Sequence, residues 1–261
     1  MQSSNLNISQ SLIKAYLEYC KGDLCGLQLE AIYIQNLFQI DSESMALGRY
    51  FEFIATGQRP KDGSTPTPLR TAKGHLTAEY KRAEDQAKRF KPFCEQMDIE
   101  ILETGTYIQR DGMEGTLDII ALVKFEGEKE KAVIDLKYSS KLYDRWDKYG
   151  WDINTLPEKD FHMIQARMYH HLSGLPFYFW VFSSSDDDSQ FIRVKIDKND
   201  RSIFNDLVEA IRQGIEIESI QGFRPIPEYK RCKECPEGLS SQCPFKASTP
   251  IIKQIYYTQT A

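Results

Sequence analysis

The residues of this chain that are best suited to chemistry are Asp118, Asp135 and Lys137. Residues 117–123 and 132–136 are rich in β-branched and apolar side chains, and a polar turn separates them, which predicts a β-hairpin. Such a hairpin can bring both carboxylates to one edge of a sheet. Because side chains alternate across a strand, Asp135 and Lys137 point to the same face. Carboxylates that can share Mg²⁺, with an amine beside them, predict metal-assisted phosphodiester hydrolysis.

Lys137 has a defined part in that chemistry, since its amine could position or help to deprotonate the attacking water, or stabilise charge on the phosphate. A single D-x-K pattern is weak evidence, because acidic and basic residues occur together on many strands. The alternative is a solvated strand end that carries a cross-strand ion pair.

Two helices are candidates to complete the site. Residues 161–172 have apolar residues at helical spacing, and Gln165 and Tyr169 are four apart, so both project from one helix face. The alternative is an ordinary amphipathic helix with Tyr169 half in the core. Glu52 lies on a second predicted helix, which Asp41 or Ser42 could cap and which runs to about residue 55. Taken alone, Glu52 fits a solvated helix face equally well.

Four segments together resemble motifs of the PD-(D/E)XK nuclease superfamily, in its RecB-like and phage-exonuclease-like branch, which includes the CRISPR-adaptation nucleases. The segments that carry the resemblance are Leu47–Glu52 (a helix entered after Gly that presents Glu), Gly115–Asp118 (G-x-x-D), Asp135–Lys137 (D/E-x-K) and Gln165–Tyr169 (Q-x-x-x-Y). They occur in the order of the family. Many relatives place a His in or near the first motif, and none is evident here.

The resemblance implies a role for each of these residues. Glu52, Asp118, Asp135 and the backbone carbonyl of Leu136 would bind Mg²⁺ or Mn²⁺. Lys137 would position the attacking water. Gln165 and Tyr169 would organise the phosphate and Lys137.

A second cluster is formed by cysteines near the C-terminal end of the sequence. Cys232 and Cys235 form a C-x-x-C pair, and Cys243 follows. These thiolates could share one metal with a fourth ligand, for which Cys20 and Cys25 are candidates. Zinc, an iron–sulfur cluster and reduced thiols that bind nothing all remain open. The arrangement resembles the [4Fe–4S] clasp of some RecB-like nucleases, and that resemblance favours Cys25 as the fourth ligand.

Composition bounds the fold and the location. The 261 residues are 41% hydrophobic and 27% charged, which is enough for one domain with a sizeable core. We expect a single domain over residues 1–261, with an N-terminal helix and with a cysteine clasp at residues 232–243 that closes the fold. No apolar run approaches a membrane span and no signal peptide is evident, so we expect a cytoplasmic protein without membrane contact. The net charge of −5 means that any DNA-binding face must be local.

The element pattern predicts an α/β fold in which helices flank a central mixed β-sheet. The family resemblance implies that this core is three-layered and restriction-endonuclease-like. Besides the hairpin, we expect strands at residues 177–182 and 191–196 and a long helix at residues 71–93. Residues 139–158 are irregular and rich in aromatic side chains. They could form a packed cover over the sheet or stack on unpaired bases.

These features predict a metal-dependent DNA nuclease, and the resemblance implies that it acts in recombination, repair or phage DNA processing. The preference for an exonuclease over an endonuclease comes from the resemblance alone. DNA is the expected partner, and a helicase, an annealing protein or another recombination factor could work beside the chain. The alternatives are a CRISPR-adaptation-like nuclease that trims DNA ends, and a non-catalytic DNA-binding or assembly module with a structural iron–sulfur or zinc clasp.

Overall fold

The computed structural model describes residues 6–38, 40–60, 62–226, 228, 232–233 and 235–246. The chain groups into two compact units. The first, here called the sheet unit, comprises Met1–Gln10 and Asp41–Val208; the second, the cysteine unit, comprises Ser11–Ile40 and Glu209–Ala261. The single domain expected over residues 1–261 stays a prediction, because compact units are not the same as independently folding domains.

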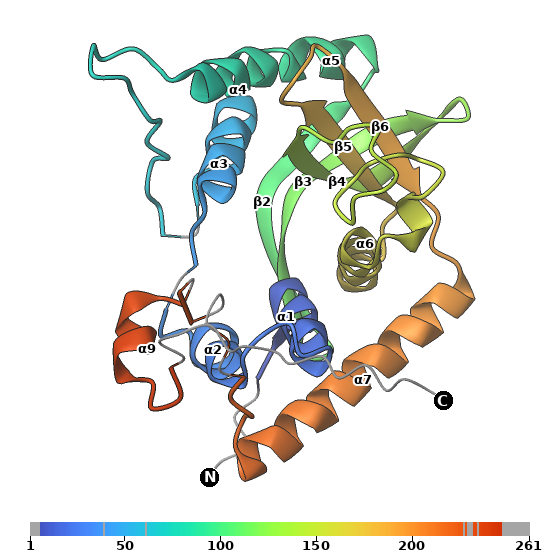
Figure 1. The fold of residues 1–261 in the computed structure, drawn as a ribbon. Helices are drawn as coiled ribbons and strands as arrows, with labels where there is room; N and C mark the ends of the chain where they lie inside the picture. The colour runs from blue at the N-terminus through green and yellow to red at the C-terminus, as the bar shows by residue number, and fades with distance from the viewer. Residues whose placement is uncertain are drawn as a thin grey trace, which may run out of the picture. The chain divides into compact units, whose positions relative to one another are not determined.

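The sheet unit contains a mixed, six-stranded sheet, as the sequence predicts (Figure 1). Its strands are β1 (Ile8–Ser9), β2 (Glu100–Arg110), β3 (Met113–Phe125), β4 (Glu128–Ser139), β5 (Phe177–Ser183) and β6 (Ser189–Val194). The order is β1-β3-β4-β5-β6, and β2 also pairs with β3. The β1–β3 and β4–β5 pairs are parallel, and the other pairs are antiparallel.

The two central strands separate part of the way along the sheet. β3 and β4 pair from the Glu126–Gly127 turn, where both residues have positive φ, as far as Ile119 and Ile134. Beyond that point β3 continues only with β2 and, at its far end, β1, whereas β4 continues with β5. Figure 1 shows β2 and β3 curving away together from β4 and β5. We call this point the fork.

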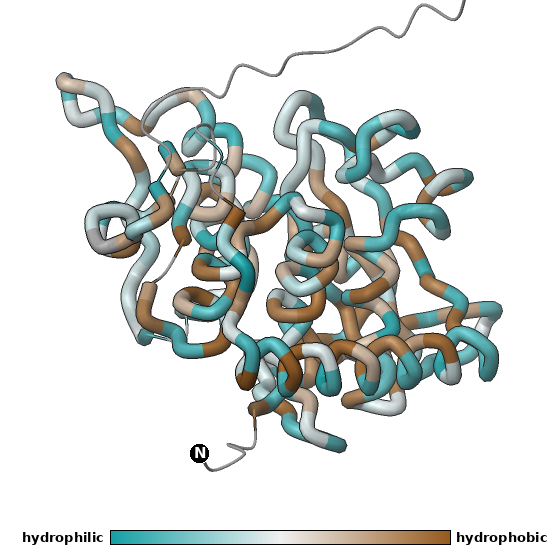
Figure 2. The backbone as a smooth tube through the Cα atoms, turned by 60° about the horizontal axis from the view of Figure 1, so that its bottom comes forward, coloured by the Kyte–Doolittle hydropathy of each residue, from teal (hydrophilic) through white to brown (hydrophobic). Residues whose placement is uncertain are grey.

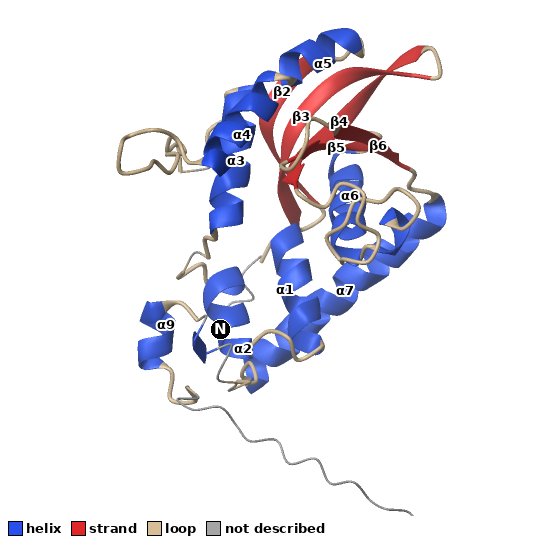
Figure 3. Ribbon diagram, turned by 45° about the horizontal axis from the view of Figure 1, so that its top comes forward, coloured by secondary structure: helices blue, strands red, loops and turns tan. Residues whose placement is uncertain are grey.

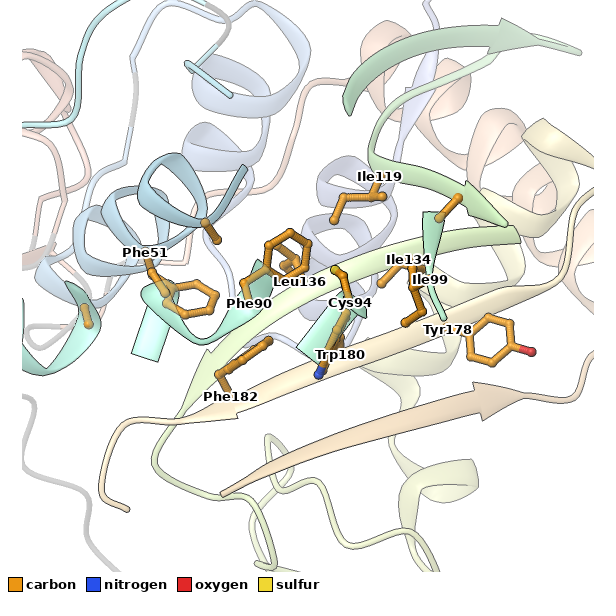
Figure 4. Packing of buried hydrophobic residues seen from close by; sticks show 14 of the residues in the cluster. Phe51, Phe90, Cys94, Ile99, Ile119, Ile134, Leu136, Tyr178, Trp180 and Phe182 are labelled. Carbon is orange, nitrogen blue, oxygen red and sulfur yellow. The ribbon is translucent and has the colours of Figure 1, made fainter. Parts of the chain in front are cut away.

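Helices cover both faces of the sheet. On one face lie α3 (Glu43–Thr56), α4 (Ala78–Lys88) and α5 (Phe90–Gln96). Their buried rings, Phe51 and Phe90 among them, pack with Trp180 and Phe182 of β5 (Figure 4). On the other face lies α6 (Asp160–Ser173), which crosses over between the parallel strands β4 and β5. The three-layer α/β arrangement is therefore confirmed.

The prediction of one long helix at residues 71–93 is wrong in two respects: the helix begins later, and it is divided into α4 and α5. Residues 71–75 form a turn inside a bridge between Arg70 and Leu76, so α4 begins only at Ala78. The helix is interrupted at Arg89, because Pro92 lacks an amide proton and its ring clashes with the carbonyl four residues earlier. The buried side of α4 and α5 is formed by Tyr80 and the apolar positions that follow it at helical spacing, Ala83, Ala87 and Phe90.

The start of α3 follows from its cap. Ser42 Oγ accepts a hydrogen bond from the amide of Met45 at 3.2 Å, so the helix begins at Glu43, and Gly57 ends it at a φ of 78°. Gly48 consequently lies inside this helix rather than at its entrance. The long helix α7 (Lys198–Gln221) starts in the sheet unit. Figure 2 shows polar residues, in teal, predominating at turns and loop tips.

In the cysteine unit, residues far apart in the sequence come together. Its elements are α1 (Gln10–Cys20), α2 (Gly26–Gln28), the π-helical turn η1 (Leu29–Ile34), the end of α7, and α9 (Glu237–Gln242). Gly26 donates its amide to the carbonyl of Arg224 at 3.0 Å. A Cβ at Gly26 would lie 2.5 Å from that oxygen, so the contact requires glycine. Among the helices of the described ranges, none has the length and apolar character needed to cross a lipid bilayer.

Candidate active site at the fork of the sheet

The fork places Asp118 next to β4. The backbone pairing between β3 and β4 stops at Ile119 and Ile134. Beyond it, the Asp118 carboxylate replaces a backbone acceptor: its Oδ2 accepts a hydrogen bond from the amide of Leu136 at 3.0 Å. The carboxylate is thereby fixed at the point where the two strands separate.

Asp135 and Lys137 share one face of β4, as the alternation of side chains predicts. The Lys137 ammonium forms an ion pair with Asp135 Oδ2, and Gln165 of α6 donates its amide to Asp135 Oδ1 at 2.5 Å. Asp135 is only 1% exposed, so its charge depends on these two contacts. The helix face that Gln165 and Tyr169 were predicted to share is therefore directed at Asp135, the aspartate of the D-x-K pattern.

Glu52 joins this group from α3, on the other side of the sheet from α6. Burial raises the pKa of Glu52; the Lys137 charge opposes this and the Asp135 charge adds to it. Burial and then the charges of Asp135 and Glu52 hold the pKa of Asp118 well above its usual range. Desolvation would lower the pKa of Lys137, but the surrounding carboxylates outweigh it and raise that pKa. Three carboxylates therefore surround one ammonium group.

This donor set fits a divalent cation of the Mg²⁺ type, which prefers carboxylate oxygens. The carboxylates outnumber the ammonium, and among the described residues the buried Asp135 Oδ2 has no hydrogen bond besides its ion pair with Lys137. A cation there would offset the burial and the mutual repulsion that raise the pKa of Glu52 and of Asp118. Within the described part of the chain, no three or more Asp, Glu, His or Cys side chains stand in a preformed metal-binding group. The Leu136 carbonyl as a ligand stays a prediction.

A groove in the sheet unit opens beside these carboxylates. It has a volume of about 670 Å³, and its lining includes Glu52, Asp118, Arg49, Arg59 and Thr116. Arg59 and Arg49, which also pairs with Asp41 at 2.5 Å, bring positive charge to the groove, and positive charge is suited to a polyanion. Sequence reasoning missed both, although Arg49 lies one helical turn before Glu52 and could have been found from that spacing.

Tyr169 explains the glycine of the G-x-x-D pattern. A Cβ at Gly115 would lie 2.8 Å from Cε1 of Tyr169 and 3.2 Å from Cδ1 of Leu172, so only glycine lets α6 approach β3 this closely. Burial, followed by the charges of Asp135 and Asp118, raises the pKa of Tyr169. The phenol therefore stays protonated and lies within the electrostatic field of the carboxylates.

The four cysteines that the sequence singled out line a single pocket of the cysteine unit: Cys25, Cys232, Cys235 and Cys243. Cys20 is exposed and is not among the residues that line this pocket. Burial raises the pKa of Cys235, and the charges of the other three thiols add to the increase. Cys25 Sγ also accepts the amide of Ile226 at 3.4 Å. Four thiols around one pocket have the chemistry that iron–sulfur clusters and zinc require, although in this structure they do not stand in a preformed metal-binding group.

Comparison with known proteins places the fold. No family model and no curated protein matches the chain. A solved structure of a provisionally named exonuclease from Eubacterium rectale matches with a TM-score of 0.56 and 18% identity, covering 98% of this chain and 92% of that one. At this identity the similarity shows the fold alone, which is an α/β fold with helices on both sides of a mixed sheet.

A weaker match is an alkaline exonuclease from Laribacter hongkongensis. Its TM-score is 0.40 at 13% identity, and the alignment covers 83% of this chain and 91% of that chain. A similarity at this level carries no argument.

Proposed function

We propose that this protein is a metal-dependent DNA nuclease whose active site lies at the fork of the sheet. The observation that carries the proposal is the meeting of Glu52, Asp118 and Asp135 around Lys137, beside a groove that contains arginines. The fold, shared with the exonuclease structure from Eubacterium rectale, agrees with this assignment.

Each residue has a task in the proposed reaction. Glu52, Asp118 and Asp135 would hold Mg²⁺, which when bound lowers the pKa of a water molecule and polarises the phosphoryl oxygen. Lys137 orients the attacking water through its ammonium group and neutralises charge that develops on the phosphate. Gln165 fixes the Asp135 carboxylate in its binding orientation.

The groove supplies the binding step. Arg49 and Arg59 line it together with Glu52 and Asp118, so phosphates held by the guanidinium groups would lie next to the carboxylates. An overall acidic protein can bind DNA in this way, because the positive charge is concentrated where the backbone of the nucleic acid lies. The intact carboxylate set with Lys137 favours catalysis over a non-catalytic binding module. The preference for exonuclease action, in recombination, repair or phage DNA processing, comes from the family resemblance.

Metal dependence is tested by thermal unfolding with and without Mg²⁺. A ligand that binds the folded state stabilises it by RT ln(1 + [L]/Kd), about 1.4 kcal/mol at ten times Kd. We expect Mg²⁺ to raise the Tm of the wild type and to have little effect on Asp135→Asn. Equal shifts in both proteins would contradict Asp135 as a ligand.

We also propose that the cysteine pocket holds a [4Fe–4S] cluster, with structural zinc as the alternative. Support comes from the four thiols around one pocket and from the backbone N–H directed at Cys25. Elemental analysis of anaerobically purified Cys25→Ser is expected to show loss of the metal, whereas the matched control Cys20→Ser retains it. Equal metal content in the two variants, or neither iron nor zinc in the wild type, would refute this proposal.

A further inference from the structure

A loop in the sheet unit links the strand and the helix that build the proposed active site. β4 carries Asp135 and Lys137 and ends at Ser139; α6 carries Gln165 and begins at Asp160. Residues 141–151 of the connection are here called the aromatic loop. In Figure 3 the connection is the tan segment beside α6.

The aromatic loop separates its rings into buried and exposed ones. Trp151 is 2% exposed and stacks on His162 of α6 at a centroid distance of 3.8 Å. Trp146, in contrast, is 84% exposed, and Tyr143 and Tyr149 are 60% and 45% exposed. Of the two alternatives predicted for this segment, a packed cover over the sheet describes Trp151, whereas Tyr143, Trp146 and Tyr149 face the solvent. A cluster of large exposed rings is typical of a binding surface.

Hydrogen bonds hold this loop in one shape. Asp144 Oδ1 accepts the amides of Trp146 at 2.8 Å and Asp147 at 3.1 Å. The buried Lys159 ammonium donates to the carbonyls of Arg145 at 2.8 Å and Asp147 at 2.5 Å. Tyr149 also packs on Phe161, one turn before Gln165 on α6, at 5.5 Å between ring centroids. A surface that is ordered before binding loses little conformational entropy when a ligand arrives.

Cations accompany two of the three exposed rings, whereas Tyr143 donates its hydroxyl to the Asp188 carboxylate. Arg145 Cζ lies 4.4 Å from the centroid of the Trp146 ring, and Lys148 Nζ lies 4.9 Å from that of Tyr149. The loop's acidic residues are engaged internally: Asp144 caps backbone amides, and Asp147 pairs with Lys141. Flat rings next to positive charges are the combination that binds an unpaired base together with its phosphate.

We propose that the aromatic loop is a stacking platform for the unpaired bases of single-stranded DNA, with Trp146 as its principal contact. Tyr149 of the loop packs on Phe161, one turn before the Gln165 that contacts Asp135, so a single strand bound to the loop would lie near the start of the helix that supports the site. The proposal deepens, and for its biological meaning rests on, the nuclease function proposed above.

The test measures binding in EDTA, so that cleavage does not interfere. Fluorescence anisotropy of a labelled oligothymidylate and of a blunt duplex of equal length would be compared for the wild type, Trp146→Ala, Trp146→Phe and Ile203→Ala. Ile203 is a matched control, because it is an exposed apolar residue on α7 outside the loop. Tryptophan fluorescence gives a second measurement, since the other two tryptophans, Trp151 and Trp180, are buried.

We expect Trp146→Ala to weaken single-strand binding about tenfold, which is within the range for loss of one stacked base, while Trp146→Phe retains most of the affinity. Ile203→Ala should bind as the wild type does, and the oligothymidylate should quench fluorescence in the wild type but not in Trp146→Phe. Equal single-strand affinity in all four proteins would overturn the platform and leave the rings as a protein-binding surface. An equal loss on single strand and duplex would overturn the specificity for unpaired bases.

The two proposals fail separately. If Lys137→Ala still cleaves DNA as the wild type does, the nuclease site is wrong, whatever Trp146 binds. If Lys137→Ala abolishes cleavage but Trp146→Ala binds single strands normally, the site stands and the platform falls.

Discussion

Replacing Gly115 with alanine would place a methyl group against the helix that carries Gln165 and Tyr169. The new Cβ would lie 2.8 Å from Cε1 of Tyr169 and 3.2 Å from Cδ1 of Leu172. Carbon atoms in contact are normally about 3.5 Å or more apart, so the ring must retreat by roughly 0.7 Å. Because the Tyr169 ring is buried and also contacts Phe177 of β5, it has little free space to move into.

The expected cost follows from these distances. Overpacking a core by one methyl group costs about 1–3 kcal/mol, while alanine in a strand recovers roughly 0.5–1 kcal/mol of backbone entropy relative to glycine. We therefore expect Gly115→Ala to lower the free energy of unfolding by about 1–2 kcal/mol and the Tm by about 2–8 °C, given the size of the chain. Cleavage should also slow, since Gln165 on the same helix would shift relative to Asp135.

The assay is urea denaturation of Gly115→Ala, with Gly48→Ala as the matched control. Gly48 lies inside α3, and a Cβ there would meet nothing within 4 Å, so this change should stabilise the protein slightly. Combining Gly115→Ala with Tyr169→Ala should relieve the clash, which would appear as a coupling energy between the two substitutions. Wild-type stability for Gly115→Ala, or strict additivity with Tyr169→Ala, would refute the packing argument.

Three further predictions concern the surroundings of the site. Gln165→Ala should reduce kcat about 10–100-fold, because Gln165 orients the Asp135 carboxylate. The control Gln86→Ala changes a buried glutamine of α4 and should leave kcat of the folded protein intact. Equal effects of the two substitutions would contradict the role of Gln165. Arg49→Gln should make the negative slope of log K against log salt for DNA binding shallower by roughly 0.9, and an unchanged slope would remove Arg49 from the phosphate contacts. Partial burial raises the pKa of Asp200, but the hydrogen bond from Arg167 outweighs this and lowers that pKa overall. The stability that this pair contributes is therefore present above about pH 4 and is lost as the pH falls through the lowered pKa. Asp200→Asn should therefore cost about 1 kcal/mol at pH 7 and nothing near pH 2, and a cost independent of pH would contradict the pairing.

The sequence predicted the parts of the site that depend on local pattern. The alternation of side chains along a strand was enough to place Asp135 and Lys137 on one face of β4. The spacing of four residues in a helix was enough to place Gln165 and Tyr169 on one face of α6. The polar turn located the hairpin. These predictions needed only geometry that repeats within one element.

The parts that it missed depend on how distant elements meet. The groove joins Arg49 and Arg59 of the α3 region with Asp118 of β3, and no periodicity within one segment relates them. The break in the helix expected at residues 71–93 does not show in the spacing of apolar residues, because it comes from the steric effect of Pro92 on the preceding turn.

The aromatic segment shows a third kind of limit. Trp146 and Trp151 are both tryptophans of one irregular stretch, yet Trp146 is exposed and Trp151 is buried against His162 and Phe179. Capping by Asp144 and the buried Lys159 decides which ring faces the solvent, and both effects require the folded loop.

The measurement that tests the account most directly is digestion of end-labelled linear DNA and closed-circular DNA by the wild type and by Lys137→Ala, with Mg²⁺ or Mn²⁺. We predict that the wild type degrades linear DNA from its ends and leaves circles intact, and that Lys137→Ala degrades neither. Cutting of circles would make the enzyme an endonuclease and contradict the preference for ends. Equal degradation by the variant, or no degradation by the wild type with either metal, would contradict the assignment of the fork as a nuclease active site.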